Sequence, residues 1–179
     1  EALPSLACEI PNLSYLIVGE GDDRARLEQK TRQLGLGERV TFTGWLNDEE
    51  LVEHYRLADA FVMPGRGEGF GIVYLEALAC GVPVVASRAD ASAEVVNGCE
   101  RATAANPSNR ADMEAAILVA LQFGCGVRPK MLERYSTAQF YERCSGIFQA
   151  VARGEGHADV AGERATKGTL VGVNGNRTP

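Results

Sequence analysis

Two glutamates, Glu68 and Glu76, stand eight positions apart, and Gly67, Gly69 and Gly71 open the backbone around the first of them. The helix expected after Gly71 adds its N-terminal dipole and the unpaired N–H groups of its first turn, an arrangement that binds phosphate without a required lysine. A carboxylate accepts hydrogen bonds from two hydroxyl groups, so it suits a ribose diol or a sugar ring. The spacing predicts a ligand that combines a sugar, a diphosphate and a ribose.

A plainer alternative is that the glycines form only a tight turn and that Glu76 is a solvated helical residue. However, Glu76 stands inside the strongly apolar segment 73–78. A charge in such a segment is seldom without a partner or a ligand. We therefore interpret Glu68 and Glu76 as functional residues.

Short apolar runs alternate with amphipathic segments from about residue 1 to residue 152. The strands expected from the apolar runs are 15–19, 39–44, 60–64, 82–86 and 101–105. The helices expected between and after them are 22–34, 47–58, 72–80, 91–96, 109–123 and 136–151. This alternation predicts an α/β fold, a parallel Rossmann-like sheet with helices on both faces. Its ligand-binding loops, at the carboxyl ends of the strands, are then 19–22, 44–47 and 65–71.

Two of these helices begin with a capping-box pattern. Asn47 precedes Glu50 by three residues, and Ser136 precedes Gln139 by the same spacing. The apolar faces at helical spacing are Leu51, Tyr55 and Ala58 in the first helix, and Phe140, Cys144, Ile147 and Val151 in the second. Residues 1–152 are thus expected to form the folded domain. The glycine-rich segment 153–179 is expected to be a disordered tail, with a weak strand signal at 169–173.

The overall charge excludes some classes of partner. The chain of 179 residues has 18 basic and 24 acidic side chains, a net charge of −6, and no basic stripe. Nucleic-acid binding is therefore disfavoured, because it needs clustered Lys and Arg. No apolar run approaches the roughly 20 residues that span a bilayer, and residues 1–11 do not resemble a signal peptide.

The five cysteines indicate neither a disulfide framework nor a zinc site. They are scattered, odd in number and without a C-x-x-C pair. We interpret them as reduced, mostly buried thiols, which favours the cytoplasm. With only two histidines in the chain, no metal cluster is expected either.

Segment 63–86, which contains both glutamates, resembles the donor-site motif of retaining glycosyltransferases of family four, whose two glutamates are separated by seven residues. Segments 15–21, 39–44 and 55–62 match that family in order and spacing, so the resemblance covers about residues 1–152. It implies the C-terminal half of a GT-B enzyme, with residues 1–152 as the donor-binding domain. It further implies a retaining hexosyltransferase that uses a UDP- or GDP-sugar as donor, with no metal and no other cofactor.

The resemblance also assigns roles by position. Glu68 would be catalytic and face the donor sugar, and Glu76 would hold the ribose hydroxyls. The other implied donor-binding positions are Gly19 at the diphosphate, Gly44, Trp45 and Leu46 at the nucleobase, and Gly69, Phe70, Gly71 and Ile72 at the sugar and phosphate. Trp45 has an alternative interpretation, packing on the sheet edge. Retention by front-face attack and by a brief covalent intermediate both stay open.

The chain departs from the family pattern at three places. Gly65 stands where the family usually has Ser, residues 90–92 read Asp-Ala-Ser in a small-residue stretch, and the Pro-rich loop is reduced to residues 106–108. Residues 1–10 match a helix that in the family follows a first strand and a basic loop. We therefore expect the donor domain to be truncated at its N-terminal side and inactive alone.

An acceptor glycan or lipid-linked acceptor would bind to a separate N-terminal domain. Peripheral membrane association is an expectation for the full-length enzyme.

Three rival functions fit the sequence less well than this one. A non-catalytic nucleotide-sugar-binding α/β module is the strongest rival. A dehydrogenase needs the motif Gly-x-Gly-x-x-Gly, and segment 19–24 lacks its third glycine. It also needs an acidic residue about 20 positions later, where this chain has a segment that begins with Arg39. An epimerase motif lacks the seven-residue spacing of the glutamates.

Overall fold

The computed structural model describes residues 1–67 and 69–154. The chain divides into two compact units, the first spanning Glu1–Leu132 and the second beginning at Glu133. All strands among the described residues belong to the first unit. The predicted boundary between a domain 1–152 and a tail 153–179 stays a prediction, since residues 155–179, with the strand signal at 169–173, lie outside the described residues.

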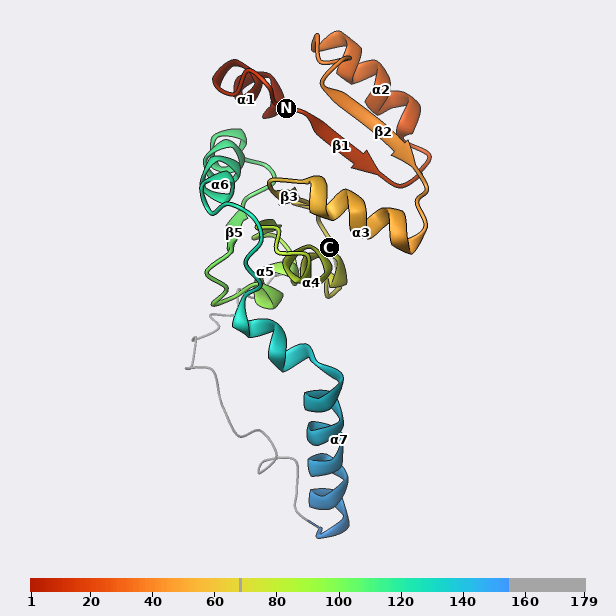
Figure 1. The fold of residues 1–179 in the computed structure, drawn as a ribbon, viewed down its shortest axis with the longest axis vertical. Helices are drawn as coiled ribbons and strands as arrows, with labels where there is room; N and C mark the ends of the chain where they lie inside the picture. The colour runs from red at the N-terminus through yellow and green to blue at the C-terminus, as the bar shows by residue number, and fades with distance from the viewer. Residues whose placement is uncertain (68, 155–179) are drawn as a thin grey trace, which may run out of the picture. The chain divides into compact units, whose positions relative to one another are not determined.

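Helices and strands follow one another in the predicted order (Figure 1). The strands are β1 Tyr15–Val18, β2 Val40–Gly44, β3 Phe61–Val62, β4 Val84–Ser87 and β5 Ala102–Ala105. The helices of the first unit are α1 Leu3–Glu9, α2 Arg24–Gln33, α3 Asp48–Leu57, α4 Ile72–Ala79, α5 Ser92–Val95 and α6 Arg110–Gln122. A 3-10 helix, Lys130–Tyr135, crosses the unit boundary, and α7 Thr137–Ala152 belongs to the second unit.

All paired strands run parallel, as predicted, but they form two sheets instead of one. One sheet has the order β1-β2 and the other β3-β4-β5. Strand β3 has only two residues, and the nearby Pro64 has no N–H to extend a ladder. The short β3 pairs with β4. The α/β class is thus confirmed, and the continuity of the sheet is not.

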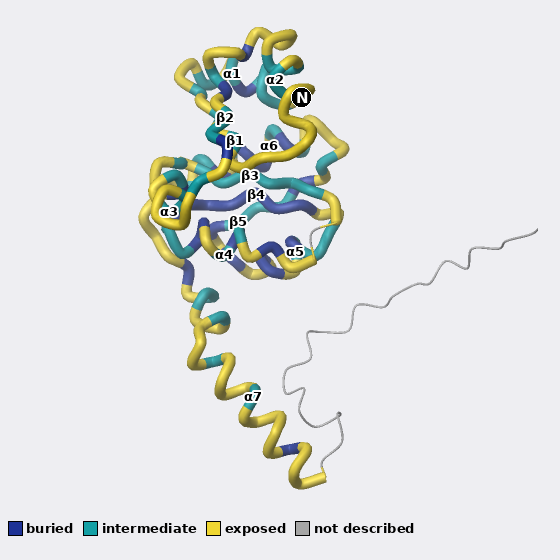
Figure 2. The backbone as a smooth tube through the Cα atoms, turned by 90° about the vertical axis from the view of Figure 1, so that its right-hand side faces the viewer, coloured by how far each residue is buried: buried dark blue, intermediate teal, exposed yellow. Residues whose placement is uncertain are grey.

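Strand β4 lies between two hydrophobic clusters, so both of its faces are covered. Val84 and Ala86 belong to one cluster with Tyr74 and Leu78 of α4, and Val85 belongs to a second cluster. That second cluster contains Leu6 of α1 and Met113, Ala116, Ile117 and Ala120 of α6. Figure 2 shows β4 as the buried strand between β3 and β5. Helices therefore cover both faces of this sheet, as the sequence predicts.

The capping predictions are confirmed at one helix and half confirmed at the other. Asn47 and Glu50 form both hydrogen bonds of a capping box at α3. At α7 the Ser136 side chain accepts the Gln139 N–H, but the Gln139 side chain donates to Glu142 instead of returning to the cap. The box at α7 is therefore incomplete.

The apolar stripe predicted on α7 is present and largely exposed. Phe140, Ile147 and Val151 are 63%, 44% and 63% exposed, and Figure 2 shows most of α7 in the exposed colour. Within the second unit, the stripe therefore lacks the burial that usually stabilises an amphipathic helix.

The thiols are all free, but the expectation that most are buried is wrong. Only Cys99 is buried; Cys8 and Cys125 are exposed, and Cys80 and Cys144 are half-buried. Scattered cysteines give no helical or strand periodicity from which burial follows. No helix among residues 1–67 and 69–154 has the length and hydropathy needed to cross a membrane.

Candidate functional site

The loops after β1 and β2 meet at the carboxyl ends of these strands. Gly19 donates its N–H to the carbonyl of Gly44 at 2.9 Å, and both glycines have positive φ, 109° and 78°. A Cβ on Gly44 would lie 3.6 Å from Arg24 Nη1 and 3.6 Å from Glu20 Oε1. The two glycines predicted from the sequence are therefore adjacent, and Arg24 and Glu20 flank them. Arg24 lies in the predicted helix 22–34, and the sequence alone assigned it no role.

Helix α4 begins directly after Gly71, whose backbone is left-handed, with φ 85° and ψ 56°. Residues with a Cβ are strained in this conformation, so glycine is the residue that fits the turn. Gly71 also offers no side chain to cap the helix, and no side-chain cap is found among residues 1–67 and 69–154. An uncapped helix N-terminus is the arrangement that accepts a phosphate group.

Glu76 lies on the exposed side of α4 although its sequence neighbours are apolar. Its Oε2 accepts a hydrogen bond from the hydroxyl of Tyr55 on α3, at 3.0 Å. Burial raises the pKa of Tyr55 well above its ordinary value, and the hydrogen bond to Glu76 raises it further. The phenol therefore remains protonated and donating at neutral pH. Tyr55 was predicted only as a core residue of its helix.

Several large apolar side chains near the predicted site are exposed. Trp45 is 73% exposed, Ile72 62% and Phe70 48%, whereas Leu46 is half-buried. At this exposure the Trp45 side chain has few packing contacts, and its alternative interpretation, packing on the sheet edge, stays a prediction as well. Its role beside a nucleobase remains a prediction.

The loop that precedes α4 contains Glu68 and approaches a second loop of the first unit. Glu68 lies outside the described residues, so its catalytic role remains a prediction; Gly69 is exposed. A Cβ on Gly65 would lie 3.9 Å from Asp90 Oδ2, so the loop before α4 approaches the loop after β4. Two of the three places that depart from the family pattern, Gly65 and residues 90–92, are therefore neighbours in space.

Two arginines near the strand ends already have acidic partners. Arg24 forms an ion pair with Glu28 at 2.9 Å, and Arg88 pairs with Asp112. The hydrogen bond from Arg88 lowers the pKa of Asp112, and the backbone N–H of Asn106 contributes in the same direction. In the described part of the chain, no three His, Cys, Asp or Glu side chains are grouped to hold a metal ion.

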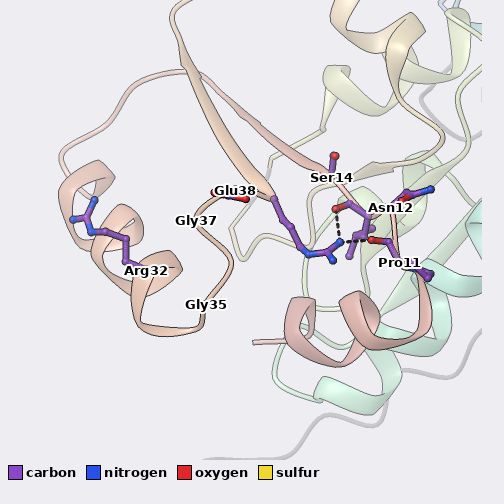
Figure 3. Close-up of a pocket in the computed structure, with 9 residues that line it drawn as sticks. Pro11, Asn12, Ser14, Arg32, Gly35, Gly37 and Glu38 are labelled. Atoms are coloured by element: carbon purple, nitrogen blue, oxygen red, sulfur yellow. Dashed lines mark hydrogen bonds between the residues drawn. The ribbon is translucent and has the colours of Figure 1, made fainter.

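A hollow of about 670 Å³ lies elsewhere, between the segments 11–14 and 32–39. Figure 3 shows Pro11, Asn12 and Ser14 on one side of it and Arg32 and Gly35 on the other. These segments directly precede β1 and β2, so the hollow lies at the amino ends of the strands. Ligands of parallel α/β folds bind at the opposite ends, so this hollow is not the donor site that the sequence predicts.

Comparison with protein families identifies the class to which this chain belongs. Residues 1–138 match the family "Glycosyl transferases group 1". This match covers well over half of the 179 residues, and the chain belongs to this family. The family resemblance predicted from segment 63–86 is thereby confirmed.

Individual relatives agree with that assignment. The chain is 46% identical over 102 residues to the GDP-mannose-dependent alpha-(1-6)-phosphatidylinositol monomannoside mannosyltransferase of Mycolicibacterium smegmatis, a match that covers 53% of this chain and 27% of the relative. It is thus similar to about a quarter of that protein's length.

Solved structures confirm the fold. Sucrose-phosphate synthase from Thermosynechococcus elongatus superposes with a TM-score of 0.68 at 26% identity, over 86% of this chain and 42% of that one. The C-terminal domain of a Glycosyl Transferase Group 1 family protein from Francisella tularensis superposes with a TM-score of 0.59 at 26% identity, over 68% of this chain and 65% of that one. The chain therefore has the fold of the C-terminal half of a GT-B glycosyltransferase.

Proposed function

We propose that this chain is the donor-binding domain of a retaining glycosyltransferase and binds a nucleotide-diphosphate sugar at the carboxyl ends of its strands. One observation carries the proposal: α4 begins at the uncapped, left-handed Gly71 and carries Glu76, which Tyr55 holds by a hydrogen bond. A helix N-terminus that can bind phosphate and an oriented carboxylate lie on the same helix, which matches a ligand with a diphosphate beside a diol. Membership of a glycosyltransferase family supports glycosyl transfer as the chemistry of this arrangement.

In this proposal backbone groups bind the diphosphate and side chains bind the ends of the donor. The N–H groups around Phe70, Gly71 and Ile72 would contact phosphate and sugar hydroxyls, and Gly19 would let the first loop approach the diphosphate. Glu76 would accept hydrogen bonds from the ribose hydroxyls. Preformed hydrogen-bond donors that point toward the leaving diphosphate stabilise its charge as the glycosidic bond breaks.

Two further positions would complete the donor site. Trp45 and Leu46, which follow the buried Gly44, would border the nucleobase. Glu68 would face the donor sugar, where positive charge develops in the transition state. Transfer would retain the anomeric configuration. No metal ion takes part in this proposal.

The acceptor and donor are proposed from the relatives. Because a similar protein is described as GDP-mannose-dependent and as acting on a phosphatidylinositol monomannoside, GDP-mannose is the first donor to test and a lipid-linked glycan the first acceptor. A separate N-terminal domain would hold that acceptor. The full-length enzyme would then work in the cytoplasm with peripheral membrane association.

The proposal is tested by titrating GDP-, UDP- and ADP-sugars into the intact protein, meaning this chain together with the proposed N-terminal domain. Calorimetry records the heat of binding, and thermal unfolding records the melting temperature. A donor that binds the folded state raises the melting temperature as its concentration exceeds Kd. Stabilisation by one nucleotide-sugar family supports the proposal; no binding by any of them at millimolar concentration contradicts it.

A second test separates an enzyme from a non-catalytic binding module. The 179-residue chain alone is expected to bind nucleotide weakly and to transfer no sugar, because it would act without the proposed N-terminal domain that orients an acceptor and excludes water. Chromatography of released nucleotide measures this directly. Acceptor-dependent transfer by the chain alone at an enzyme-like rate would contradict the two-domain account. Absence of transfer by the intact protein would favour the binding module.

A further inference from the structure

We infer that Tyr55 is a positioning residue for the donor ribose: its hydroxyl fixes the carboxylate of Glu76 in the orientation that receives the ribose hydroxyls. This inference rests on the proposed function, because it assigns Tyr55 a role at the same site. The two residues lie 21 positions apart, on α3 and α4, and meet through a hydrogen bond of 3.0 Å. Tyr55 would act through Glu76 and would not itself contact the donor.

The ring of Tyr55 is held firmly enough to aim its hydroxyl. Tyr55 is only 7% exposed and packs edge-to-face on Phe61, with ring centroids 5.5 Å apart. Phe61 in turn packs edge-to-face on the fully buried Tyr74 at 5.7 Å. Close packing restricts the rotamers of a buried ring in such a stack, so the core constrains the position of the phenol oxygen.

Glu76 itself has no comparable constraint. Its side chain lies on the exposed side of α4, where a glutamate ordinarily samples several rotamers. In the described part of the chain, the Tyr55 hydroxyl is the hydrogen-bond partner of the Glu76 carboxylate. Without that bond, binding a ribose would have to restrict the free side chain, at an entropic cost that a preformed orientation avoids.

The geometry of the carboxylate leaves capacity for the ligand. Tyr55 donates to Oε2, and a carboxylate has about four acceptor sites on two oxygens. Oε1 and the second lone pair of Oε2 therefore remain available for two hydroxyl groups. The raised pKa of Tyr55 keeps the phenol protonated near neutral pH. The hydrogen bond from Tyr55 to Glu76 therefore does not depend on pH in that range.

The test is a cycle of variants in the intact protein, read as Kd for GDP, or for UDP if the donor titrations select it. Tyr55→Phe keeps the buried ring and removes only the hydroxyl, and it should raise Kd about 3- to 10-fold. In a Glu76→Ala background, Tyr55→Phe should cause no further change, because the group through which it acts is gone. For the 2′,3′-dideoxy nucleotide, Tyr55→Phe should leave Kd unchanged.

Tyr74→Phe is the matched control. It removes a hydroxyl from the same aromatic stack, but that hydroxyl donates to the carbonyl of Met63 and not to Glu76. Its Kd should stay within about twofold of wild type, while its melting temperature falls by a similar amount to that of Tyr55→Phe.

The possible outcomes separate this inference from the proposed function. Unchanged nucleotide affinity in Tyr55→Phe, alongside weak binding in Glu76→Ala, would overturn the positioning role and leave the site intact. Equal weakening of the normal and dideoxy nucleotides by Tyr55→Phe would show a merely structural role and would also overturn it. Unchanged affinity in Glu76→Ala would remove Glu76 from the site and overturn the proposed function together with the inference.

Discussion

The β3-β4-β5 sheet and the β1-β2 pair contribute to the site in different ways. Strand β4 is fully buried, and the α4 residue Tyr74 packs in the cluster on one of its faces at 0% exposure. On β1, by contrast, Leu16 and Val18 are 38% and 42% exposed. The first region uses a packed core to hold a side chain, Glu76. The second region provides backbone groups and the glycines Gly19 and Gly44 at the ends of its strands. A site can thus combine a rigid side-chain contact with loops that admit the ligand closely.

The largest expected difference between the two regions is in stability. Tyr74→Ala should cost about 3–5 kcal/mol of unfolding free energy, because it leaves a cavity in the packed cluster. Leu16→Ala should cost about 1 kcal/mol or less, since its side chain is partly exposed in the folded state. Urea unfolding of both variants measures the difference. Equal losses would contradict the contrast between the two regions.

A substitution at Glu68 separates chemistry from binding. In the intact protein, Glu68→Gln should lower turnover about 10²- to 10³-fold, because the lost charge would face the sugar where positive charge develops. Nucleotide affinity should remain near wild type. Steady-state kinetics and calorimetry together measure the split. Wild-type turnover would leave Glu68 as a residue that only shapes the loop.

Gly44→Ala tests the backbone contribution of the β1-β2 pair. The added Cβ meets ordinary contacts at 3.6 Å, so the cost should come from φ 78°, about 1 kcal/mol in unfolding free energy. Nucleotide affinity should fall as well, because the loop would shift. Gly37→Ala is the matched control, since Gly37 has open space and no left-handed backbone. If both variants unfold alike, the conformation of Gly44 carries no special constraint.

The smallest effect concerns the ion pair between Arg88 and Asp112, which links the end of β4 to α6. The folded state lowers the pKa of Asp112, so the pair contributes stability above the unfolded pKa and loses it as pH falls through the folded pKa. The Asp112→Asn variant should therefore lose less stability than wild type between about pH 4 and pH 2. Thermal unfolding across that range tests this. Identical acid slopes would show that the pair is not coupled to folding.

The order of elements was predictable because apolar runs and caps are local signals. The strand at β4 and the cap formed by Asn47 and Glu50 follow directly from adjacent residues. The division into two sheets was not predictable, because it depends on how many ladder bonds the two-residue β3 can form.

The backbone conformation of the candidate site was easier to predict from the sequence than its side-chain contacts. Gly71 is left-handed at the start of α4, as a glycine-rich turn suggests. The hydrogen bond of Tyr55 to Glu76 joins residues 21 positions apart, and the sequence alone marks Tyr55 only as an apolar-face residue. Side-chain pairs that form between separate helices leave no periodic signal in the sequence.

Calorimetric titration of GDP into wild-type, Glu76→Ala and Glu53→Ala proteins tests the central claim most directly. Glu53 is an exposed glutamate on α3 and serves as the matched control for loss of one surface charge. Loss of the ribose contact in Glu76→Ala should cost about 1.5–3 kcal/mol of binding free energy, or roughly a 10- to 100-fold rise in Kd. Glu53→Ala should bind like wild type. The same Kd in all three proteins would contradict the account, because Glu76 would then hold no part of the nucleotide.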